Sequence, residues 1–491
     1  MSNPANHPRT ATFDGDDHFH DECGVFGIYR HPDAAAHVAL GLHALQHRGQ
    51  EAAGVVSYDG TQFNSHRALG HVGDNFNSEE IIRTLPGEMA IGHVRYSTSG
   101  DTVLRNVQPL FADFKFGGLA IAHNGNLTNA YAIRTALVER GCIFQSTSDT
   151  ETFIHLIAIS EGTNVVERMT DALRQVEGAY SLVAMTREKL IGVRDPKGVR
   201  PLVLGKIGES LILASETCAL DIIGAEFVRD IEPGELVVID KKGLHSFKPF
   251  VPTPTKFCIF EYIYFARPDS NVDGRNVYQI RKNIGAELAR ETGIEADVIV
   301  PVPDSGVPAA IGYAEQSGIQ FELGIIRNHY VGRTFIEPTQ QIRNLGVKLK
   351  HNANAQYLKG KRVVLVDDSI VRGTTSVKIV DMVRAAGATE VHMCISSPPI
   401  THPCFYGIDT PEREELMAAN HDLEAMRRIV GVDSLAFISF DGLYRAVGHE
   451  GRNEDCPQYC DACFSGDYPI RLTDQEAGPT PKQLSLLNTQ D

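Results

Sequence analysis

The chain has 491 residues, of which 42% are hydrophobic and 22% are charged. These values predict roughly two to four globular domains and exclude collagen-like, mucin-like and wholly disordered chains. The formal net charge is -16, from 46 Lys and Arg against 62 Asp and Glu. This balance argues against a broad nucleic-acid or anionic-membrane surface, so an anionic ligand must be bound by local groups.

Neither a membrane span nor a secretory signal is predicted. No apolar run approaches the roughly 20 residues that a bilayer requires, and residues 1–22 lack the apolar centre of a signal peptide. We therefore expect a cytoplasmic protein. In that reducing compartment the nine cysteines indicate catalysis, metal binding or burial rather than a disulfide framework.

The composition of the N-terminal half changes at Cys23, from polar residues to short apolar runs. Residues 1–22 are acidic and polar, which cannot form a packed core, and we interpret them as a removable leader. The residues that follow form short β-type runs separated by Gly, Asp and Asn turns, with a helical pattern at 149–162. This pattern is typical of stacked antiparallel sheets and helices, and we assign residues 23–246 to one domain.

A second domain is expected after the proline-containing stretch 247–256, which predicts a linker. The runs VIVPVP (298–303) and RVVLV (362–366) are rich in β-branched residues, and each is followed by a small-residue turn and a helical pattern. Strands buried on both faces of a parallel α/β sheet have this composition. We assign this domain to residues 257–470 and expect the polar tail 471–491 to fray.

The segment VVLVDDSIVRGTTS (363–376) joins a strand to a helix through two adjacent carboxylates, Asp367 and Asp368. Backbone N–H groups at such a helix start bind phosphate. The carboxylates would repel a bare phosphate, so they suit sugar hydroxyls or a bridging metal ion. The alternative is that they only cap the helix.

This segment resembles the phosphoribosyl pyrophosphate (PRPP) loop of type I phosphoribosyltransferases. The resemblance implies PRPP contacts from Asp367, Asp368, Ser369, Arg372, Gly373, Thr374 and Thr375. The turn PVPDSGVPAA (301–310) resembles the pyrophosphate-side loop, which implies that Ser305 joins Asp367 and Asp368 at Mg²⁺, although such turns are ordinary by themselves. Residues 327–343 resemble the lid over PRPP; the alternative is a solvated surface loop.

Cys23 opens the string CGVFGIY directly after the leader. If the leader is removed, the thiol carries its own base, because a terminal α-amine has a pKa of about 7.7–8.0. Most single cysteines only fill space in a core, so the assignment depends on other motifs. The strings HVRYSTSG (93–100), AHNGNLTN (122–129) and SDTETF (148–153) follow in order. Together they resemble the glutaminase domain of the N-terminal-nucleophile amidotransferases.

The resemblance implies a role for each string. Arg95 would bind the α-carboxylate of glutamine, Asp149 its α-ammonium, and Asn124 with the N–H of Gly125 the oxyanion. Taken singly, the alternatives are a surface ion pair for Arg95, a hairpin turn at Asn124 and Gly125, and a helix N-cap at Asp149. His93 is expected to be a structural hydrogen-bond partner, since the α-amine already serves as base.

Cys460 and Cys463 form a C-x-x-C pair whose thiolates can reach one metal centre. Their surroundings resemble the iron-sulfur-containing, propeptide-bearing branch of the glutamine PRPP amidotransferases, which implies Cys258 and Cys404 as the other ligands of a [4Fe-4S] cluster. Four thiolates also suit Zn²⁺, and Cys456 could compete as a ligand. Three further cysteines are expected to be buried thiols: Cys142, Cys218 and Cys394.

The resemblance covers residues 23–470 and implies an N-terminal-nucleophile glutaminase sandwich (αββα) followed by an α/β type I phosphoribosyltransferase domain. It implies the first committed step of de novo purine synthesis, in which glutamine, PRPP and water give 5-phosphoribosylamine, glutamate and pyrophosphate. Ammonia would pass inside the protein from Cys23 to Mg²⁺-bound PRPP. Feedback inhibition by purine nucleotides and a homo-oligomer, dimer or tetramer, are also implied.

Two other functions stay open. One is a different amidotransferase with the same glutaminase, such as an enzyme of hexosamine synthesis, which would leave the phosphoribosyl motif unexplained. The other is a PRPP-sensing regulatory protein that binds PRPP without turnover.

Overall fold

The computed structural model describes residues 23–96, 103–328 and 351–476. The predicted leader 1–22, most of the predicted lid 327–343 and the end of the polar tail lie outside the described residues, as do residues 97–100 of the HVRYSTSG string. In the part of the chain that is described, none of the helices combines the length and apolar character that crossing a bilayer requires.

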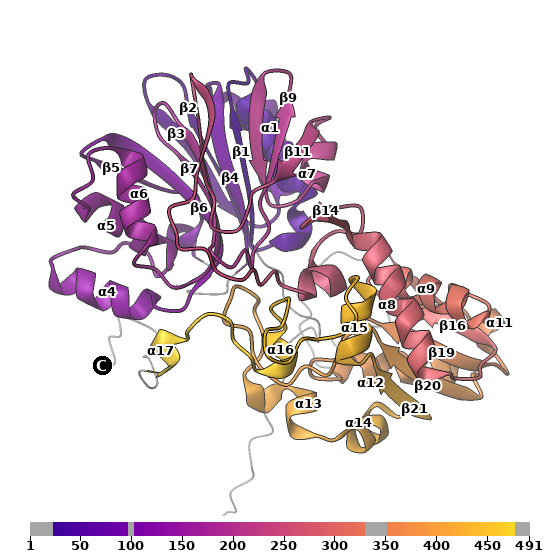
Figure 1. Cartoon of the computed structure of the whole chain (residues 1–491). Helices are drawn as coiled ribbons and strands as arrows, with labels where there is room; N and C mark the ends of the chain where they lie inside the picture. Colours follow the sequence, from indigo (N-terminus) through magenta and orange to yellow (C-terminus); the bar gives the residue numbers. More distant parts are fainter. Residues whose placement is uncertain (1–22, 97–102, 329–350, 477–491) are drawn as a thin grey trace, which may run out of the picture.

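The first domain is a sandwich of two antiparallel sheets with helices on both outer faces (Figure 1). One sheet has the order β11-β9-β10-β1-β4-β2-β3, with bounds β1 Gly24–Tyr29, β2 Ala52–Tyr58, β3 Phe63–Leu69, β4 Met89–Arg95, β9 Val203–Ile207, β10 Ser210–Ala214 and β11 Glu226–Asp230. The other has the order β13-β12-β8-β7-β6-β5, with bounds β5 Leu110–Phe114, β6 Gly117–Leu127, β7 Gly178–Met185, β8 Leu190–Arg194, β12 Leu236–Asp240 and β13 Gly243–Phe247. This arrangement confirms the predicted αββα fold.

The helices of this domain cover the outer faces of the sheets. Helices α1 and α7 pack on the first sheet, and α5 and α6 pack on the second. The bounds are α1 Ala34–Ala44, η1 Gln46–Arg48, α2 Val72–Asn75, α3 Glu79–Arg83, η2 Leu104–Asn106, α4 Ala130–Glu139, α5 Thr150–Ile159, α6 Val165–Leu173 and α7 Cys218–Asp221.

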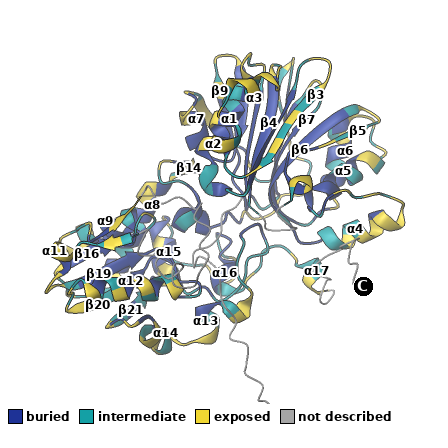
Figure 2. Ribbon diagram, turned by 180° about the vertical axis from the view of Figure 1, so that it is seen from behind, coloured by how far each residue is buried: buried dark blue, intermediate teal, exposed yellow. Residues whose placement is uncertain are grey.

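Strand β1 shows why the central strands of the sandwich are apolar. Phe26 and Ile28 pack under the outer helices, whereas Val25 faces the core between the sheets. A β-carbon on Gly27 would lie 2.7 Å from Val183, so a glycine is needed where the two sheets approach each other. The central strands β1, β4, β7 and β8 therefore lack the polar alternation of a half-exposed sheet and are buried along almost their whole length, whereas the edge strands β3, β5, β11 and β13 are partly exposed (Figure 2).

The second domain contains a parallel sheet of order β16-β19-β20-β21 with helices on both faces, which confirms the predicted α/β architecture. Val364 and Val366 face α8, α9 and α15, whereas Val363 and Leu365 face α12 and α14. The bounds here are α8 Val277–Thr292, β16 Val298–Pro301, α9 Val307–Ser317, β19 Arg362–Asp367, α12 Thr374–Ala385, β20 Glu390–Ile395, α14 Leu423–Val430, β21 Ser434–Phe437 and α15 Phe440–Ala446.

Shorter elements complete this domain. A two-stranded antiparallel ribbon, β17 with β18, flanks residues 329–350. The remaining bounds are η3 Glu261–Phe265, β14 Asn271–Val272, β15 Arg275–Asn276, β17 Ile325–Arg327, β18 His351–Ala353, α11 Ala355–Leu358, η4 Arg413–Glu415, α13 Met417–Asn420, α16 Ala462–Ser465 and α17 Thr473–Glu476.

The C-terminal tail returns to the first domain (Figure 1). The expectation that the tail frays from residue 471 is wrong for residues 471–476, which include α17. The Asp474 carboxylate accepts hydrogen bonds from the backbone N–H groups of Tyr131 at 2.8 Å and Ala132 at 3.0 Å. These N–H groups lie in the first turn of α4, where the helix itself supplies no acceptor, so an acidic residue from the tail is held there.

Candidate active site

Cys23 lies directly before β1, and its thiol is buried. Its Sγ donates to the carbonyl oxygen of Tyr96 at 3.5 Å. The antiparallel register of β1 with β4, in which Gly24 faces Val94, brings Cys23 to the end of β4 beside Arg95. Burial raises the pKa of the Cys23 thiol to about 11, although Tyr96 and the positive charge of Arg95 oppose this shift. The thiol therefore needs a base close by in order to act as a nucleophile at neutral pH.

Arg95 and Asp149 are both buried at this site, so the alternative of a surface ion pair for Arg95 is wrong. Among the described residues, the Asp149 side chain makes no capping bond to α5. Its carboxylate instead accepts from the N–H of Leu127 at 3.0 Å and lies 3.6 Å from Nδ1 of His123. Burial favours protonation of Asp149, but His123 and the hydrogen bonds outweigh it and lower its pKa. An ionised carboxylate is thus available for an ammonium group.

Asn124 and Gly125 lie inside β6, opposite Ser181 and Tyr180 of β7, and do not form a hairpin turn. Asn124 is fully buried, yet neither Oδ1 nor Nδ2 has a hydrogen-bond partner among the described residues. Gly125 has φ of +136°, and a β-carbon there would lie 2.0 Å from the oxygen of Ala179. A buried amide with unused hydrogen-bonding groups is costly unless a ligand or reaction intermediate uses them.

His93 is fully buried beside these residues. Its Nε2 lies 3.0 Å from the carbonyl oxygen of His123. Burial lowers the pKa of His93 to about 3, so the ring is neutral at physiological pH. This geometry supports the structural role predicted for His93 and not that of a base.

The predicted phosphate loop begins at the carboxyl end of β19, where Asp367, Asp368 and Ser369 are buried. Ser369 Oγ donates to Oδ1 of Asp368 at 2.5 Å, whereas Oδ2 of Asp368 has no partner among the described residues. Helix α12 starts only after Gly373, so the two carboxylates do not cap it. Thr374 and Thr375 form its first turn, and the N–H groups at a helix start are suited to a phosphate.

The loop that carries Ser305 lies against the end of the same strand. The N–H of Val302 donates to the oxygen of Val366 at 2.9 Å. A β-carbon on Gly306 would lie 2.4 Å from that oxygen. The two predicted anion loops are therefore neighbours at the carboxyl edge of the parallel sheet, which is where ligands bind in such folds.

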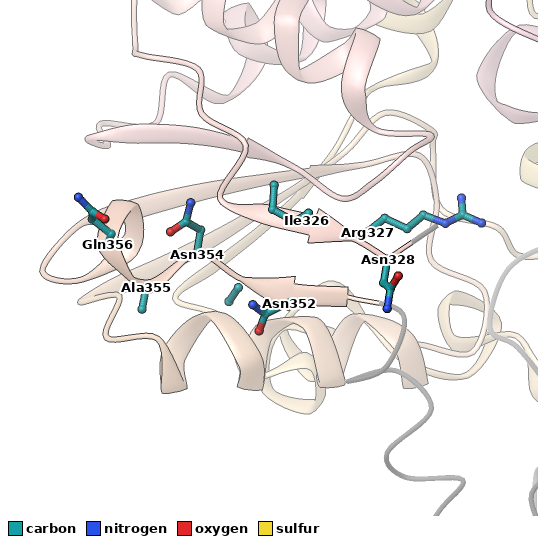
Figure 3. Close-up of a pocket in the computed structure, with 8 residues that line it drawn as sticks. Ile326, Arg327, Asn328, Asn352, Asn354, Ala355 and Gln356 are labelled. Atoms are coloured by element: carbon teal, nitrogen blue, oxygen red, sulfur yellow. The ribbon is translucent and has the colours of Figure 1, made fainter. Parts of the chain in front are cut away.

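Two features near this edge were not predicted from the sequence. The Arg372 guanidinium, an expected PRPP contact, donates to Oε2 of Glu415 at 2.7 Å. A hollow of about 730 Å³ lies along β17, β18 and α11 (Figure 3). Arg327, on its rim, forms an ion pair of 2.6 Å with Asp304 of the Ser305 loop.

The four predicted cluster cysteines come from three segments that meet. Cys258 and Cys460 form a parallel bridge, in which the Ile259 N–H donates to the oxygen of Cys460 at 3.1 Å. The oxygen of Cys463 accepts from the N–H groups of residues 401 and 402, which draws the segment of Cys404 to α16. Burial and then the charges of Cys258, Cys404 and Cys460 raise the pKa of Cys463 well above its ordinary value.

The other cysteines differ in exposure. Cys456 is exposed, and its Sγ lies 3.7 Å from Nζ of Lys256. Cys218 and Cys394 are buried, as expected, but Cys142 is only partly buried, so that expectation is wrong for Cys142. Within the described ranges, no three or more His, Cys, Asp or Glu side chains are grouped so that they could hold one metal ion.

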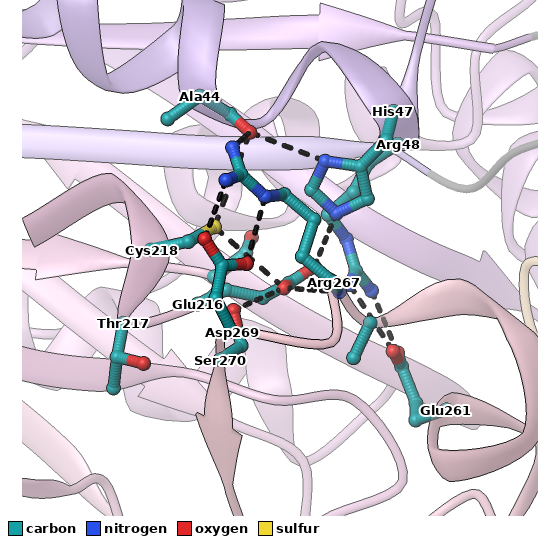
Figure 4. Close-up of polar contacts among 12 residues, drawn as sticks. Ala44, His47, Arg48, Glu216, Thr217, Cys218, Glu261, Arg267, Asp269 and Ser270 are labelled. Carbon is teal, nitrogen blue, oxygen red and sulfur yellow. Dashed lines mark hydrogen bonds and ion pairs between the residues drawn. The ribbon is translucent and has the colours of Figure 1, made fainter. Parts of the chain in front are cut away.

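A buried ionic cluster around Arg48, shown in Figure 4, was also not predicted. Arg48 donates from Nε to the carbonyl oxygen of Cys23 at 3.2 Å, and its guanidinium binds both Glu216 and Glu261. Glu216 also accepts from Ser270 Oγ at 2.7 Å. No local motif marks such a cluster, because its members are far apart in the sequence.

Comparison with known families gives two matches. Residues 93–221 match the glutamine amidotransferase domain family, and residues 272–400 match the phosphoribosyl transferase domain family. The chain is 58% identical to the amidophosphoribosyltransferase of Rhizobium etli, over 99% of both chains. It is 49% identical to that of Bacillus subtilis, over 95% of this chain and 98% of the relative.

Two solved structures share the whole architecture. The glutamine PRPP amidotransferase of B. subtilis, complexed with ADP and GMP, has a TM-score of 0.87 at 48% identity, over 92% of this chain and 98% of that chain. A structure described as the allosteric regulatory enzyme of purine biosynthesis has a TM-score of 0.88 at 49% identity, over 92% of this chain and 97% of that chain.

Proposed function

Since this chain belongs to the amidophosphoribosyltransferase family, we propose that its two sites together convert glutamine, PRPP and water into 5-phosphoribosylamine, glutamate and pyrophosphate. This reaction is the first committed step of purine synthesis. The observation that carries the proposal is that each site contains a fully or almost fully buried polar side chain, Asn124 in one and Asp368 in the other, with atoms left for a ligand.

In the first site, the Cys23 thiolate attacks the side-chain amide of glutamine and forms a thioester, which releases ammonia. Asn124 and the N–H of Gly125 stabilise the oxyanion of each tetrahedral intermediate. Arg95 and Asp149 hold the α-carboxylate and the α-ammonium group. Water then cleaves the thioester and frees glutamate and the thiol.

Activation of Cys23 requires removal of residues 1–22. Because burial raises the pKa of the thiol to about 11, few thiolates exist at neutral pH without a base. Cleavage before Cys23 would create an α-amine with a pKa of about 7.7–8.0 on the same residue, which can take the proton. The mass of the purified protein tests this step: we expect a chain that begins at Cys23, and a chain that begins at Met1 would contradict it.

In the second site, the turn at the start of α12 binds the 5′-phosphate of PRPP, with contacts from Arg372, Gly373, Thr374 and Thr375. Asp367, Asp368 and Ser369 bind the ribose hydroxyls. Asp367, Asp368 and Ser305 would hold Mg²⁺, which when bound offsets the charge of the pyrophosphate. The Oδ2 atom of buried Asp368, which has no hydrogen-bond partner in the described part of the chain, supports this assignment. Ammonia attacks C1 of the ribose, and pyrophosphate leaves.

Ammonia has to reach the second site inside the protein, because bulk water would protonate it and remove its nucleophilicity. The two domains share a buried core, which contains Val199 of the first domain and Phe257 and Tyr406 of the second, so the interface between them is closed to solvent there. The predicted lid at 327–343 would close over PRPP and exclude water.

Cys258, Cys404, Cys460 and Cys463 would hold a [4Fe-4S] cluster. Their residues fit such a group, because the three segments meet, three of the thiols are buried, and the charges of neighbouring cysteines add to burial in raising the pKa of Cys258 and Cys463. Four thiolates would also suit Zn²⁺. We assign the cluster a structural or oxygen-sensing role, since neither half-reaction transfers electrons. Iron and acid-labile sulfide in anaerobically prepared protein would support the cluster, and stoichiometric zinc would contradict it.

Regulation is proposed from a relative, and assembly from the family resemblance alone. A relative was solved with ADP and GMP, so we propose that purine nucleotides bind and inhibit this enzyme as well. A homodimer or homotetramer in the cytoplasm completes the proposal.

The division of labour between the sites is tested by Cys23→Ala. We expect this variant to lose glutamine-dependent synthesis and to keep synthesis from PRPP and ammonia. Cys142→Ala is the matched control, because Cys142 is a partly buried thiol of the same domain. Glutamine use by the Cys23→Ala variant, or loss of the ammonia reaction in a folded protein, would refute the assignment.

A further inference from the structure

We propose that Glu261, in the segment that follows the first domain, is a positioning residue for the glutaminase nucleophile and acts through Arg48. The inference rests on the proposed function, because it requires Cys23 to be the nucleophile. Glu261 itself touches neither Cys23 nor any residue assigned to glutamine in the contacts of the structure's described residues.

Arg48 is the first step of the argument. It belongs to η1, and its side chain is completely buried. Its Nε donates to the carbonyl oxygen of Cys23 at 3.2 Å. That carbonyl lies on the same residue as the thiol, so the orientation of the Cys23 backbone fixes the direction from which Sγ meets a substrate.

Glu261 sets the orientation of Arg48. Its Oε1 accepts from Nη2 of Arg48 at 2.6 Å and its Oε2 from Nη1 at 3.1 Å. Both side chains are fully buried. Two parallel bonds between a carboxylate and a planar guanidinium fix the plane of the guanidinium as well as its position. Glu216 binds the same guanidinium from another side, as Figure 4 shows.

Glu261 is anchored outside the glutaminase domain. It opens η3, three residues after Cys258. Arg281 of α8 holds η3 by donating to the carbonyl oxygens of Tyr262 at 2.8 Å and of residues 264 and 266 at 2.7 Å. The carboxylate therefore reaches Arg48 from a segment that is packed on the second domain.

A second buried cation connects Glu261 to the loop of Cys404. Arg200 lies 3.4 Å from Oε1 of Glu261, and its Nε donates to the carbonyl oxygen of Tyr406 at 3.0 Å. Glu261 thus lies between Arg48 and Arg200, and both arginines are buried. A shift of either second-domain segment would move the carboxylate and, with it, the cation that holds Cys23.

The test is Glu261→Gln, which keeps the size of the side chain but places an amide N–H₂ against one of the guanidinium groups. We expect kcat for glutamine hydrolysis to fall about 10- to 100-fold, the size of effect that a misplaced reacting group produces. The KM for glutamine should stay within about twofold, because Arg95 and Asp149 are untouched. Synthesis from PRPP and ammonia should also stay within about twofold. The rate of Cys23 alkylation by iodoacetamide gives a direct readout of the thiol.

Glu287→Gln is the matched control. Glu287, on α8, forms an ion pair of 2.9 Å with Arg445 of α15 and is largely buried, and it belongs to the second domain, away from the glutaminase site. This variant should change none of the four quantities. If Glu261→Gln does not fold, Glu261→Asp retains the charge while shortening the reach, and the same loss in kcat is expected.

Three results separate the possible failures. An unchanged kcat and alkylation rate in the Glu261 variant would overturn the inference while leaving the proposed function intact. Equal loss of the glutamine and ammonia reactions would show a merely structural role and would also overturn it. Retention of glutamine use by Cys23→Ala would instead overturn the proposed function.

Discussion

Replacing Asn124 by alanine should lower the rate of glutamine hydrolysis and leave the stability of the fold almost unchanged. The Asn124 amide is fully buried, and neither of its polar atoms has a partner among the described residues. Loss of one oxyanion donor costs about 2.7–4 kcal/mol in the transition state, so kcat for glutamine hydrolysis should fall about 100- to 1,000-fold.

Stability should change little in the same variant. Removing a buried unpartnered amide relieves a penalty of about 1–3 kcal/mol, and the small cavity that remains costs about 1 kcal/mol. We therefore expect Tm to stay constant or to rise slightly in calorimetry, with the ammonia reaction retained.

Asn106 provides the matched comparison, because it is equally buried but its side chain bonds to Thr147 at 2.8 and 3.0 Å. Asn106→Ala should lose about 2 kcal/mol, or roughly 4–8 °C in Tm for a domain of this size. If Asn124→Ala loses as much stability as Asn106→Ala, or if it keeps full glutaminase activity, then Asn124 is not the hydrogen-bond donor to the oxyanion.

Four further outcomes are expected. In Gly407→Ala, the new β-carbon would lie 2.8 Å from Cα of Gly125, on a backbone with φ of +114°. We therefore expect kcat for glutamine hydrolysis to fall about tenfold or more in a glutaminase assay, while the ammonia reaction is retained. Alkylation of Cys23, measured against pH, should rise toward pH 11 while residues 1–22 remain attached, because burial raises the thiol pKa to about 11; after cleavage it should rise near pH 8, where the α-amine loses its proton. Asp368→Asn should reduce ammonia-dependent synthesis about 100-fold while basal glutamine hydrolysis continues, and equal loss of both would count against the assignment. Asp474→Ala should lower Tm by about 2–4 °C through the loss of the cap on α4, with no change in the ammonia reaction; an unchanged Tm would mean that the tail contributes nothing.

The parts of the site that were predictable are those whose chemistry is local. A pair of carboxylates, a glycine turn and a helix start are contiguous from Asp367 to Thr375, and their order alone indicates a sugar-phosphate loop. The same holds for strands such as β19, because a run of β-branched residues predicts burial on both faces. Even the companions of Cys23 were recognisable, since each occupies a short string of its own.

What the sequence by itself determined was therefore the kind of chemistry, the two-domain division and the residue types at each site. Only the tertiary structure decided which groups are left without partners and which distant segments hold them. The Asn124 amide, buried in β6, has no partner among the described residues, and Glu261 reaches Arg48 across 213 positions of the chain. In the same way, a long-range hydrogen bond from the N–H of Tyr131 to Asp474 holds residues 471–476 against α4. Such contacts depend on low-dielectric burial and on the register between strands and segments, and neither quantity is encoded in any short stretch of residues.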